Sequence, residues 1–200
     1  VDLAPVSLSN TVFVGDSLTV GMGMSGSIPG AIPLYKGGMQ TGWMKSQFLK
    51  MLDERKKGKY PGLKRVVIMG GINDLSSTKG AKSVIRNLEA MYKAAKEAGL
   101  TVVAATIPDW DYRRFQPILV KRWEKRGWGK QKGVYPYSAQ QLSSQTQEVN
   151  NWIMSQKGKL VDVVVDTYNG GFERSGDGLH RTRKGSTQMA QAIMREGKIG

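Results

Sequence analysis

His180 is the only histidine in this 200-residue chain, so it is the only side chain that can offer an imidazole base. Asp177 lies three residues before it, in the segment Asp177-Gly178-Leu179-His180. A serine hydroxyl is a weak nucleophile until a base takes its proton, and a carboxylate can hold that base in the right tautomer. Acyl transfer from a serine of this chain would therefore use His180, with Asp177 as the candidate orienting acid. Most isolated Asp-x-x-His pairs are structural, with the acid capping a helix start, so the pair alone does not decide.

The composition excludes several other kinds of site. The chain contains no cysteine, which rules out disulfide scaffolds, thiolate zinc sites and cysteine nucleophiles. A single histidine also rules out metal sites built from several imidazoles. We therefore expect no metal centre. No apolar stretch approaches the roughly 18 residues of a membrane span, so none is expected.

Apolar runs alternate with amphipathic segments along the chain. This alternation indicates βαβ units and an α/β fold, with a mainly parallel sheet covered on both faces. The length fits one domain over residues 1–200. The expected strands are 11–14, 63–69, 100–105 and 161–165, with a weaker candidate at 31–35, and the expected helices are 42–53, 81–98, 138–156 and 187–196.

Polar residues follow three of the expected strands. Gly15-Asp16-Ser17-Leu18 follows the first strand, and Gly70-Gly71-Ile72-Asn73-Asp74 follows the strand at 63–69. The last strand leads through a glycine-rich loop to His180. Because the carboxyl ends of parallel strands meet at one rim, all three segments should meet there. Taken singly, Ser17 could be a helix cap and Asn73 a turn residue.

The three segments together resemble a known family. Gly15-Asp16-Ser17-Leu18, Gly71-Ile72-Asn73-Asp74 and Asp177-x-x-His180, in this order, resemble the motifs of the GDSL, or SGNH, hydrolases. The resemblance covers about residues 12–193. It implies a flavodoxin-like, three-layer α/β/α fold and the hydrolysis of ester bonds without a cofactor.

The resemblance also assigns roles to individual residues. It implies that Ser17 is the nucleophile, His180 the base and Asp177 the acid that orients it. The oxyanion donors would be the Asn73 side-chain amide, the Ser17 backbone N–H and a glycine N–H. We favour Gly38 for this glycine over its neighbour Gly37, within the segment Lys36-Gly37-Gly38-Met39-Gln40-Thr41.

Residues 109–135 differ from the rest of the chain in composition. They contain eight Lys or Arg, three Asp or Glu, and six aromatic residues. The segment is long for a strand-to-helix connection, so we expect an insertion on the active rim with a short helix at 116–126. It is either a solvated basic face whose aromatic residues pack on the body, or a lid or glycan platform. In the second case the candidate substrate-binding residues are Trp110, Arg113, Arg114 and Trp123.

The charge suggests the kind of partner. Thirty Lys and Arg against sixteen Asp and Glu give a net charge of +14, which favours anionic partners such as an anionic glycan. No nucleic-acid module signature is found, so nucleic acid is disfavoured. An envelope or extracellular glycan would suit this charge, and we favour a secreted or cell-envelope location over a cytoplasmic one. The oligomeric state stays open.

Three functions are compatible with these residues. The first is a serine esterase that removes a small acyl group, foremost O-acetyl, from a carbohydrate through an acyl-enzyme. The second is a lipolytic or thioester hydrolase of the same fold, which would need a longer apolar acyl groove. The third is a non-catalytic basic module that binds a glycan or another polyanion through residues 109–135.

Overall fold

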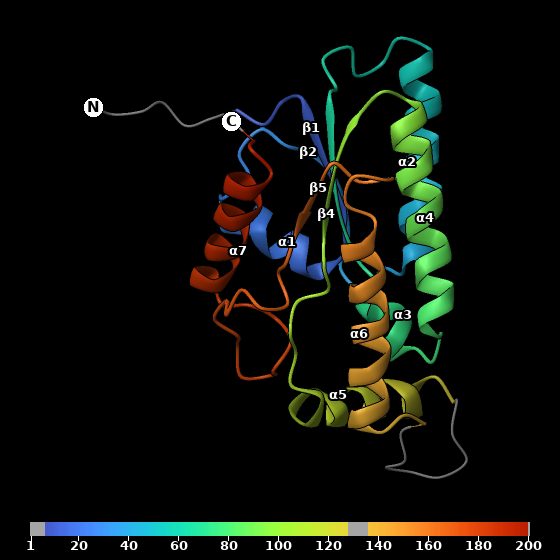
Figure 1. Ribbon diagram of the computed structural model, residues 1–200. Helices are drawn as coiled ribbons and strands as arrows, with labels where there is room; N and C mark the ends of the chain where they lie inside the picture. The colour runs from blue at the N-terminus through green and yellow to red at the C-terminus, as the bar shows by residue number, and fades with distance from the viewer. Residues whose placement is uncertain (1–6, 128–135, 200) are drawn as a thin grey trace.

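The computed structural model describes residues 7–127 and 136–199. At its centre lies a parallel sheet of five strands in the order β2-β1-β3-β4-β5 (Figure 1). This order places the first strand inside the sheet, between the second and the third, and it confirms the α/β prediction. The strands are β1 (Thr11–Gly15), β2 (Ile32–Tyr35), β3 (Arg65–Met69), β4 (Thr101–Ala105) and β5 (Val163–Val165).

Helices cover both faces of the sheet, which gives the expected three layers (Figure 1). The helices α1 (Ser17–Met24) and α7 (Arg183–Glu196) lie on one face. The other face carries α2 (Thr41–Lys56), α4 (Ala81–Glu97) and α6 (Ala139–Ser155).

Each central strand is apolar beyond its first residue because it contributes to both cores. Successive side chains of a strand point to opposite faces. In β1, Val12 and Val14 join the core under α2, α4 and α6, whereas Phe13 joins the core under α1 and α7. The strand β3 divides in the same way, with Val66 in the first core and Val67 in the second. The two cores hold the carboxyl ends of these strands in fixed positions.

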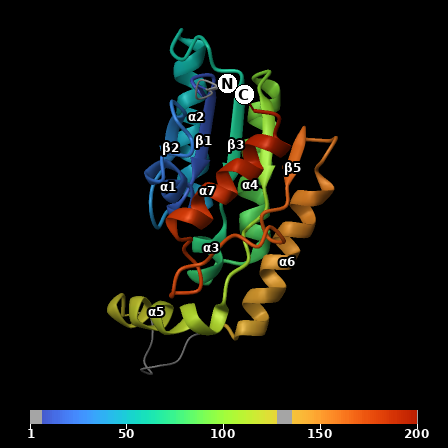
Figure 2. The same cartoon turned by 90° about the vertical axis from the view of Figure 1, so that its left-hand side faces the viewer.

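Two further helices lie at the carboxyl ends of the strands (Figures 1 and 2). They are the short helix α3 (Ile72–Ser76) and the helix α5 (Tyr112–Lys125). The helix α5 starts earlier than the predicted 116–126, because the Asp111 carboxylate caps it by accepting from the backbone N–H groups of Arg113 and Arg114, both at 3.1 Å. The rest of the predicted insertion, residues 128–135, lies outside the described residues.

The sequence patterns missed α1 and α3 and placed the start of the last helix too late. The helix α1 contains glycine at Gly21, where an added Cβ would lie 2.9 Å from the Ser186 hydroxyl of α7. The two helices therefore pack so closely that only glycine fits at this position. Because glycine is a poor helix former, the sequence pattern there does not indicate a helix. The helix α7 begins at Arg183 because Thr182 accepts from the Gly185 N–H at 3.1 Å. Within the described ranges, no helix is long and apolar enough to cross a membrane.

Candidate active site

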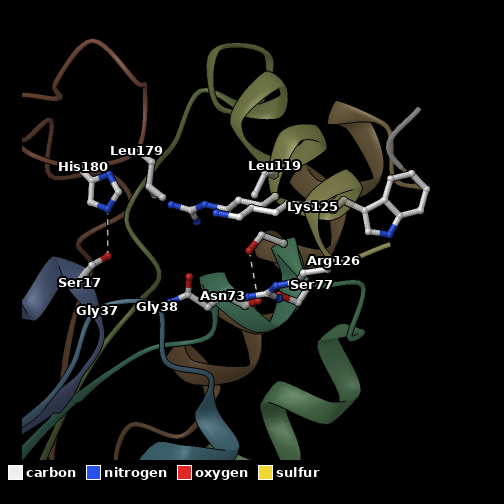
Figure 3. Close-up of a pocket in the computed structure, with 13 residues that line it drawn as sticks. Ser17, Gly37, Gly38, Asn73, Ser77, Leu119, Lys125, Arg126, Leu179 and His180 are labelled. Carbon is white, nitrogen blue, oxygen red and sulfur yellow. Dashed lines mark hydrogen bonds between the residues drawn. The ribbon is translucent and has the colours of Figure 1, made fainter. Parts of the chain in front are cut away.

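Ser17 and His180 lie within hydrogen-bond distance of each other, although 163 residues separate them in the chain. Ser17 is the first residue of α1, and Asp16 alone separates it from the end of β1. The buried carboxylate of Asp16 caps this helix by accepting from the Leu18 N–H at 3.0 Å. The Ser17 Oγ lies 3.1 Å from the His180 Nε2 (Figure 3). This distance allows a proton to pass from the hydroxyl to the ring.

Asp177 holds the other nitrogen of the His180 ring. Its Oδ2 lies 2.5 Å from the His180 Nδ1, and its Oδ1 accepts at 2.9 Å from the Ser175 hydroxyl and from the backbone N–H groups of Leu179 and His180. Burial raises the pKa of this carboxyl, but the hydrogen bonds from the His180 ring and the other donors outweigh burial and lower the pKa to about 2. An ionised Asp177 accepts from Nδ1–H, which leaves the unprotonated Nε2 facing Ser17.

A buried arginine fixes the loop that carries these two residues. The Arg181 side chain donates to the carbonyl oxygen and to the carboxylate of Asp109, both at 2.7 Å, and also to the Leu179 carbonyl oxygen. The Asp111 N–H donates to the Gly178 carbonyl oxygen at 2.8 Å. The segment between β4 and α5 therefore braces the loop that positions His180.

Asn73 enters the site from α3, which follows β3. Its Nδ2 donates to the Met39 carbonyl oxygen at 3.0 Å. The neighbouring Asp74 is buried and accepts from the backbone N–H and the hydroxyl of Thr41, at 2.8 and 2.7 Å. Burial raises the pKa of Asp74. These bonds tie α3 to the start of α2, and the second N–H of the Asn73 amide is available to another acceptor.

Gly37 and Gly38 lie in the loop between β2 and α2, and both line a pocket that Ser17 and His180 also line. A Cβ added at Gly37 would lie 3.9 Å from the Ser17 Cβ, which places Gly37 beside Ser17. Gly38 has a φ of +77°, which favours glycine. Within residues 7–127 and 136–199, neither glycine N–H donates to a backbone acceptor. The choice of Gly38 as the third oxyanion donor stays a prediction.

The Ser17 and His180 side chains open into a pocket of about 730 Å³ (Figure 3). Asn73 and the two glycines form one side of it, and α5 forms the opposite side. The described part of the pocket lining contains no Asp or Glu. The lining residues are Ser17, Gly37, Gly38, Asn73, Ser76, Ser77, Leu119, Arg122, Trp123, Lys125, Arg126, Leu179 and His180.

Of the four candidate substrate-binding residues in 109–135, Trp123 alone lines this pocket. The prediction for Trp110 is wrong, because its side chain is 3% exposed and its Nε1 donates to the Thr146 hydroxyl at 3.3 Å. Trp110 also packs edge-on against the rings of two neighbours, so it is a core residue. Arg113 and Arg114 are exposed outside the pocket, and Arg114 pairs with Asp111 at 3.6 Å.

The sequence interpretation missed the basic residues that line the pocket at the end of α5. They are Arg122 and Lys125 of the helix and Arg126, which caps its C-terminus. Leu119, Arg122 and Arg126 step by three and four residues, which puts them on one helix face. The same spacing lies within the helix predicted at 116–126, so the sequence could have indicated this shared face. In the part of the chain that the structure describes, no group of three or more His, Cys, Asp or Glu is arranged to hold a metal ion.

Comparison with solved structures finds the same fold in several proteins. A GDSL-like lipase from Bacteroides thetaiotaomicron superposes with a TM-score of 0.64 at 18% identity, over 96% of this chain and 90% of that one. A family 3 carbohydrate esterase from Talaromyces cellulolyticus gives 0.59 at 16% identity, over 94% and 96%. The C-terminal catalytic domain of the peptidoglycan O-acetyltransferase A of Streptococcus pneumoniae gives 0.62 at 15% identity, over 96% and 93%.

The sequence itself matches a family model. No curated protein matches the chain. Residues 13–187, however, match the model of the GDSL-like lipase/acylhydrolase family, and this range includes Ser17, Asn73, Asp177 and His180. The structures above share the three-layer fold. With most of its length matched, the chain belongs to the GDSL-like lipase/acylhydrolase family.

Proposed function

We propose that the protein is a serine esterase that removes a small acyl group, foremost acetyl, from a carbohydrate. The observation that carries the proposal is the chain of contacts from the Ser17 Oγ through the His180 ring to the Asp177 carboxylate, with Ser17 and His180 at the wall of an open pocket. Asn73 and Gly38 line the same pocket, where a tetrahedral intermediate would need donors.

In the first half of the proposed reaction, the Ser17 Oγ attacks the carbonyl carbon of the ester while the His180 Nε2 takes its proton. The carbonyl oxygen becomes an oxyanion, which accepts from the Asn73 amide and from the Gly38 and Ser17 backbone N–H groups. One such donor typically contributes about a hundred- to a thousand-fold to the rate. The ionised Asp177 stabilises the imidazolium that forms.

In the second half, the intermediate collapses. The bond between the carbonyl carbon and the sugar oxygen breaks, and His180 returns its proton to that oxygen, which leaves as the alcohol. Water then attacks the acyl-Ser17 ester while the His180 Nε2 takes a proton from it. Collapse of the second intermediate releases the carboxylic acid and restores the Ser17 hydroxyl.

The pocket lining supports a short acyl group and a polar leaving group. Its apolar side chains are Leu119, Leu179 and Trp123, and the others described are small, polar or basic. A long acyl chain would need a more extended apolar groove. Similarity in fold to a carbohydrate esterase and to a peptidoglycan O-acetyltransferase domain is consistent with a glycan substrate. The net charge of +14 supports an anionic glycan of the cell envelope or the extracellular space.

A lipolytic or thioester hydrolase is the enzymatic alternative, and the fold is also similar to that of a GDSL-like lipase. Nitrophenyl esters of increasing acyl length separate the two functions. We expect kcat/KM to be highest for acetate and to fall by about tenfold or more at eight carbons. A preference for eight or more carbons would establish the lipolytic alternative instead.

Covalent labelling tests the chemistry directly. We expect a fluorophosphonate to modify Ser17, which lies in the tryptic peptide that ends at Lys36, and to inactivate the protein. Ser17→Ala and His180→Ala should remove the label, whereas Ser76→Ala, a second serine at the pocket wall, should keep it. Absence of the label from Ser17 in the wild type, with function retained in Ser17→Ala, would favour the non-catalytic basic module.

A further inference from the structure

The wall of the pocket opposite Asn73 carries positive charge that the proposed hydrolysis does not use. Arg122 and Lys125 line the pocket from α5, Arg126 lines it from the C-terminal cap of this helix, and the described lining holds no carboxylate. Figure 3 shows Leu119 and Lys125 across the pocket from Gly38 and Asn73. Attack on a neutral ester requires none of these cations.

We propose that this basic wall is a subsite for an oxyanion on the substrate, a carboxylate or a phosphate borne by the same sugar chain as the acyl group. The substrate class would then be an acylated acidic glycan. The inference rests on the proposed esterase function, and it adds the charge of the substrate and the residues that recognise it.

Arg122 connects this subsite to the nucleophile. Its guanidinium carbon lies 5.6 Å from the centroid of the Phe115 ring. The same ring meets the His180 ring edge-on, with centroids 6.2 Å apart. Phe115 is buried, so it fixes the place of Arg122 relative to His180. An oxyanion held by Arg122 would therefore lie close to the ester that Ser17 attacks.

The remaining cations extend the subsite toward the end of α5. Lys125 follows Arg122 by three residues, so both lie toward one side of the helix. A guanidinium can pair with two oxygens of a carboxylate or phosphate, while an ammonium acts as a point charge. Trp123, which also lines the pocket, offers an aromatic face for a sugar ring. The wall can thus bind both the charge and the ring of an anionic sugar.

The proposed subsite predicts a preference for anionic esters. Acetate release would be measured from O-acetylated oligogalacturonate, from the same oligomer with methyl-esterified carboxylates, and from acetylated glucose 6-phosphate. We expect the wild type to have a higher kcat/KM for an anionic probe than for the neutral methyl ester, and this ratio should fall as salt shortens the Debye length. The carboxylate and phosphate probes show which oxyanion fits.

Variants locate the preference on α5. Arg122→Gln with Lys125→Gln should lower the anionic-to-neutral ratio of kcat/KM about five- to tenfold, since each partly screened ion pair contributes a few-fold. Lys121→Gln is the matched control, because Lys121 is an exposed cation of the same helix outside the pocket. It should leave the ratio unchanged. An equal ratio in the wild type and the double variant overturns the subsite.

Binding measured without turnover separates the two proposals. In Ser17→Ala, isothermal titration with de-acetylated oligogalacturonate and with glucose 6-phosphate should show affinity that Arg122→Gln with Lys125→Gln weakens by a similar factor. Such binding, found together with a wild type that hydrolyses none of the esters, would refute the proposed function and support the subsite. Hydrolysis without any anionic preference, and without this binding, would refute the subsite alone.

Discussion

The buried guanidinium of Arg181 binds both the backbone carbonyl and the carboxylate of Asp109, 72 residues away, with each contact at 2.7 Å. Its side chain is 1% exposed, whereas that of Asp109 is 34% exposed. Because Arg181 directly follows His180, this pair fixes the end of the loop that orients the imidazole. Precise placement of His180 therefore depends on Asp109, which lies in the connection between β4 and α5.

Removing this pair should reduce both stability and turnover. Arg181→Met leaves Asp109 without its buried partner, and breaking such a pair costs about 3 kcal/mol, or about 6–12 °C in melting temperature for a protein of this size. We expect kcat to fall about 10- to 100-fold as His180 loses its position. Thermal melts and steady-state kinetics test both effects. Arg174→Gln, which removes a partly exposed contact at 3.2 Å to the same carboxylate, should change each much less.

The two adjacent glycines should respond differently to alanine. Gly38→Ala forces a side chain into the left-handed region at φ +77°, which costs about 1–2 kcal/mol. A Cβ at Gly37 would make only an ordinary contact at 3.9 Å. We therefore expect Gly38→Ala to lower the melting temperature and kcat more than Gly37→Ala does. Equal losses in the two variants would contradict a special backbone requirement at Gly38.

Asp16 should make stability depend on pH. Burial raises its pKa from 3.8 to about 6, so ionisation costs more in the folded protein than in the unfolded chain. Its favourable contribution is fully present below about pH 4 and is lost as pH rises through 6. The loss amounts to about 3 kcal/mol.

The Asp16→Asn variant keeps a capping side chain and cannot ionise. Its free energy of unfolding, relative to that of the wild type, should therefore rise between pH 4 and pH 7 by about 2 kcal/mol, which is most of that loss. Urea unfolding at both pH values measures this difference. A difference that stays constant over the range would show that Asp16 ionises as easily in the folded state as in the unfolded chain.

The two tryptophans near the site should separate stability from binding. Trp110→Ala should destabilise the fold by about 3–5 kcal/mol, because its side chain is buried among other aromatic rings. Trp123→Ala should instead raise KM for an acylated glycan about 2- to 10-fold by removing an aromatic wall of the pocket. Melting curves and KM for both variants test the contrast, and a KM effect confined to Trp110→Ala would reverse it.

The sequence was sufficient to predict that Ser17 and His180 would meet, because parallel strands bring their carboxyl ends to one rim. The apolar runs at β1 and β3 are long enough to be recognised as buried strands. The three-residue spacing between Asp177 and His180 points to a catalytic pair only when the fold brings His180 to the same rim as Ser17. Tertiary packing, and not a local pattern, determined the glycine-containing helix α1.

Residues 109–135 were harder to interpret, because composition does not show which face of a helix is buried. Trp110 and Trp123 are the same residue type in the same basic segment, yet one packs in the core and the other lines the pocket. The boundary of α5 depends on the Asp111 cap, which moves its start to Tyr112. With that start fixed, the helical period places Arg122 and Arg126 on one face.

The two ends of helix α5 have different roles. Contacts near Asp111 and Phe115 support the imidazole, whereas the pocket cations begin at Arg122, which packs on the Phe115 ring, and continue toward the C-terminal end of the helix. Mutations at the distal end can therefore alter which esters are preferred while the proximal end keeps its architecture. Because the two roles lie at different ends of the helix, substitutions at the C-terminal end could change substrate preference during evolution while the contacts that position His180 beside Ser17 are kept.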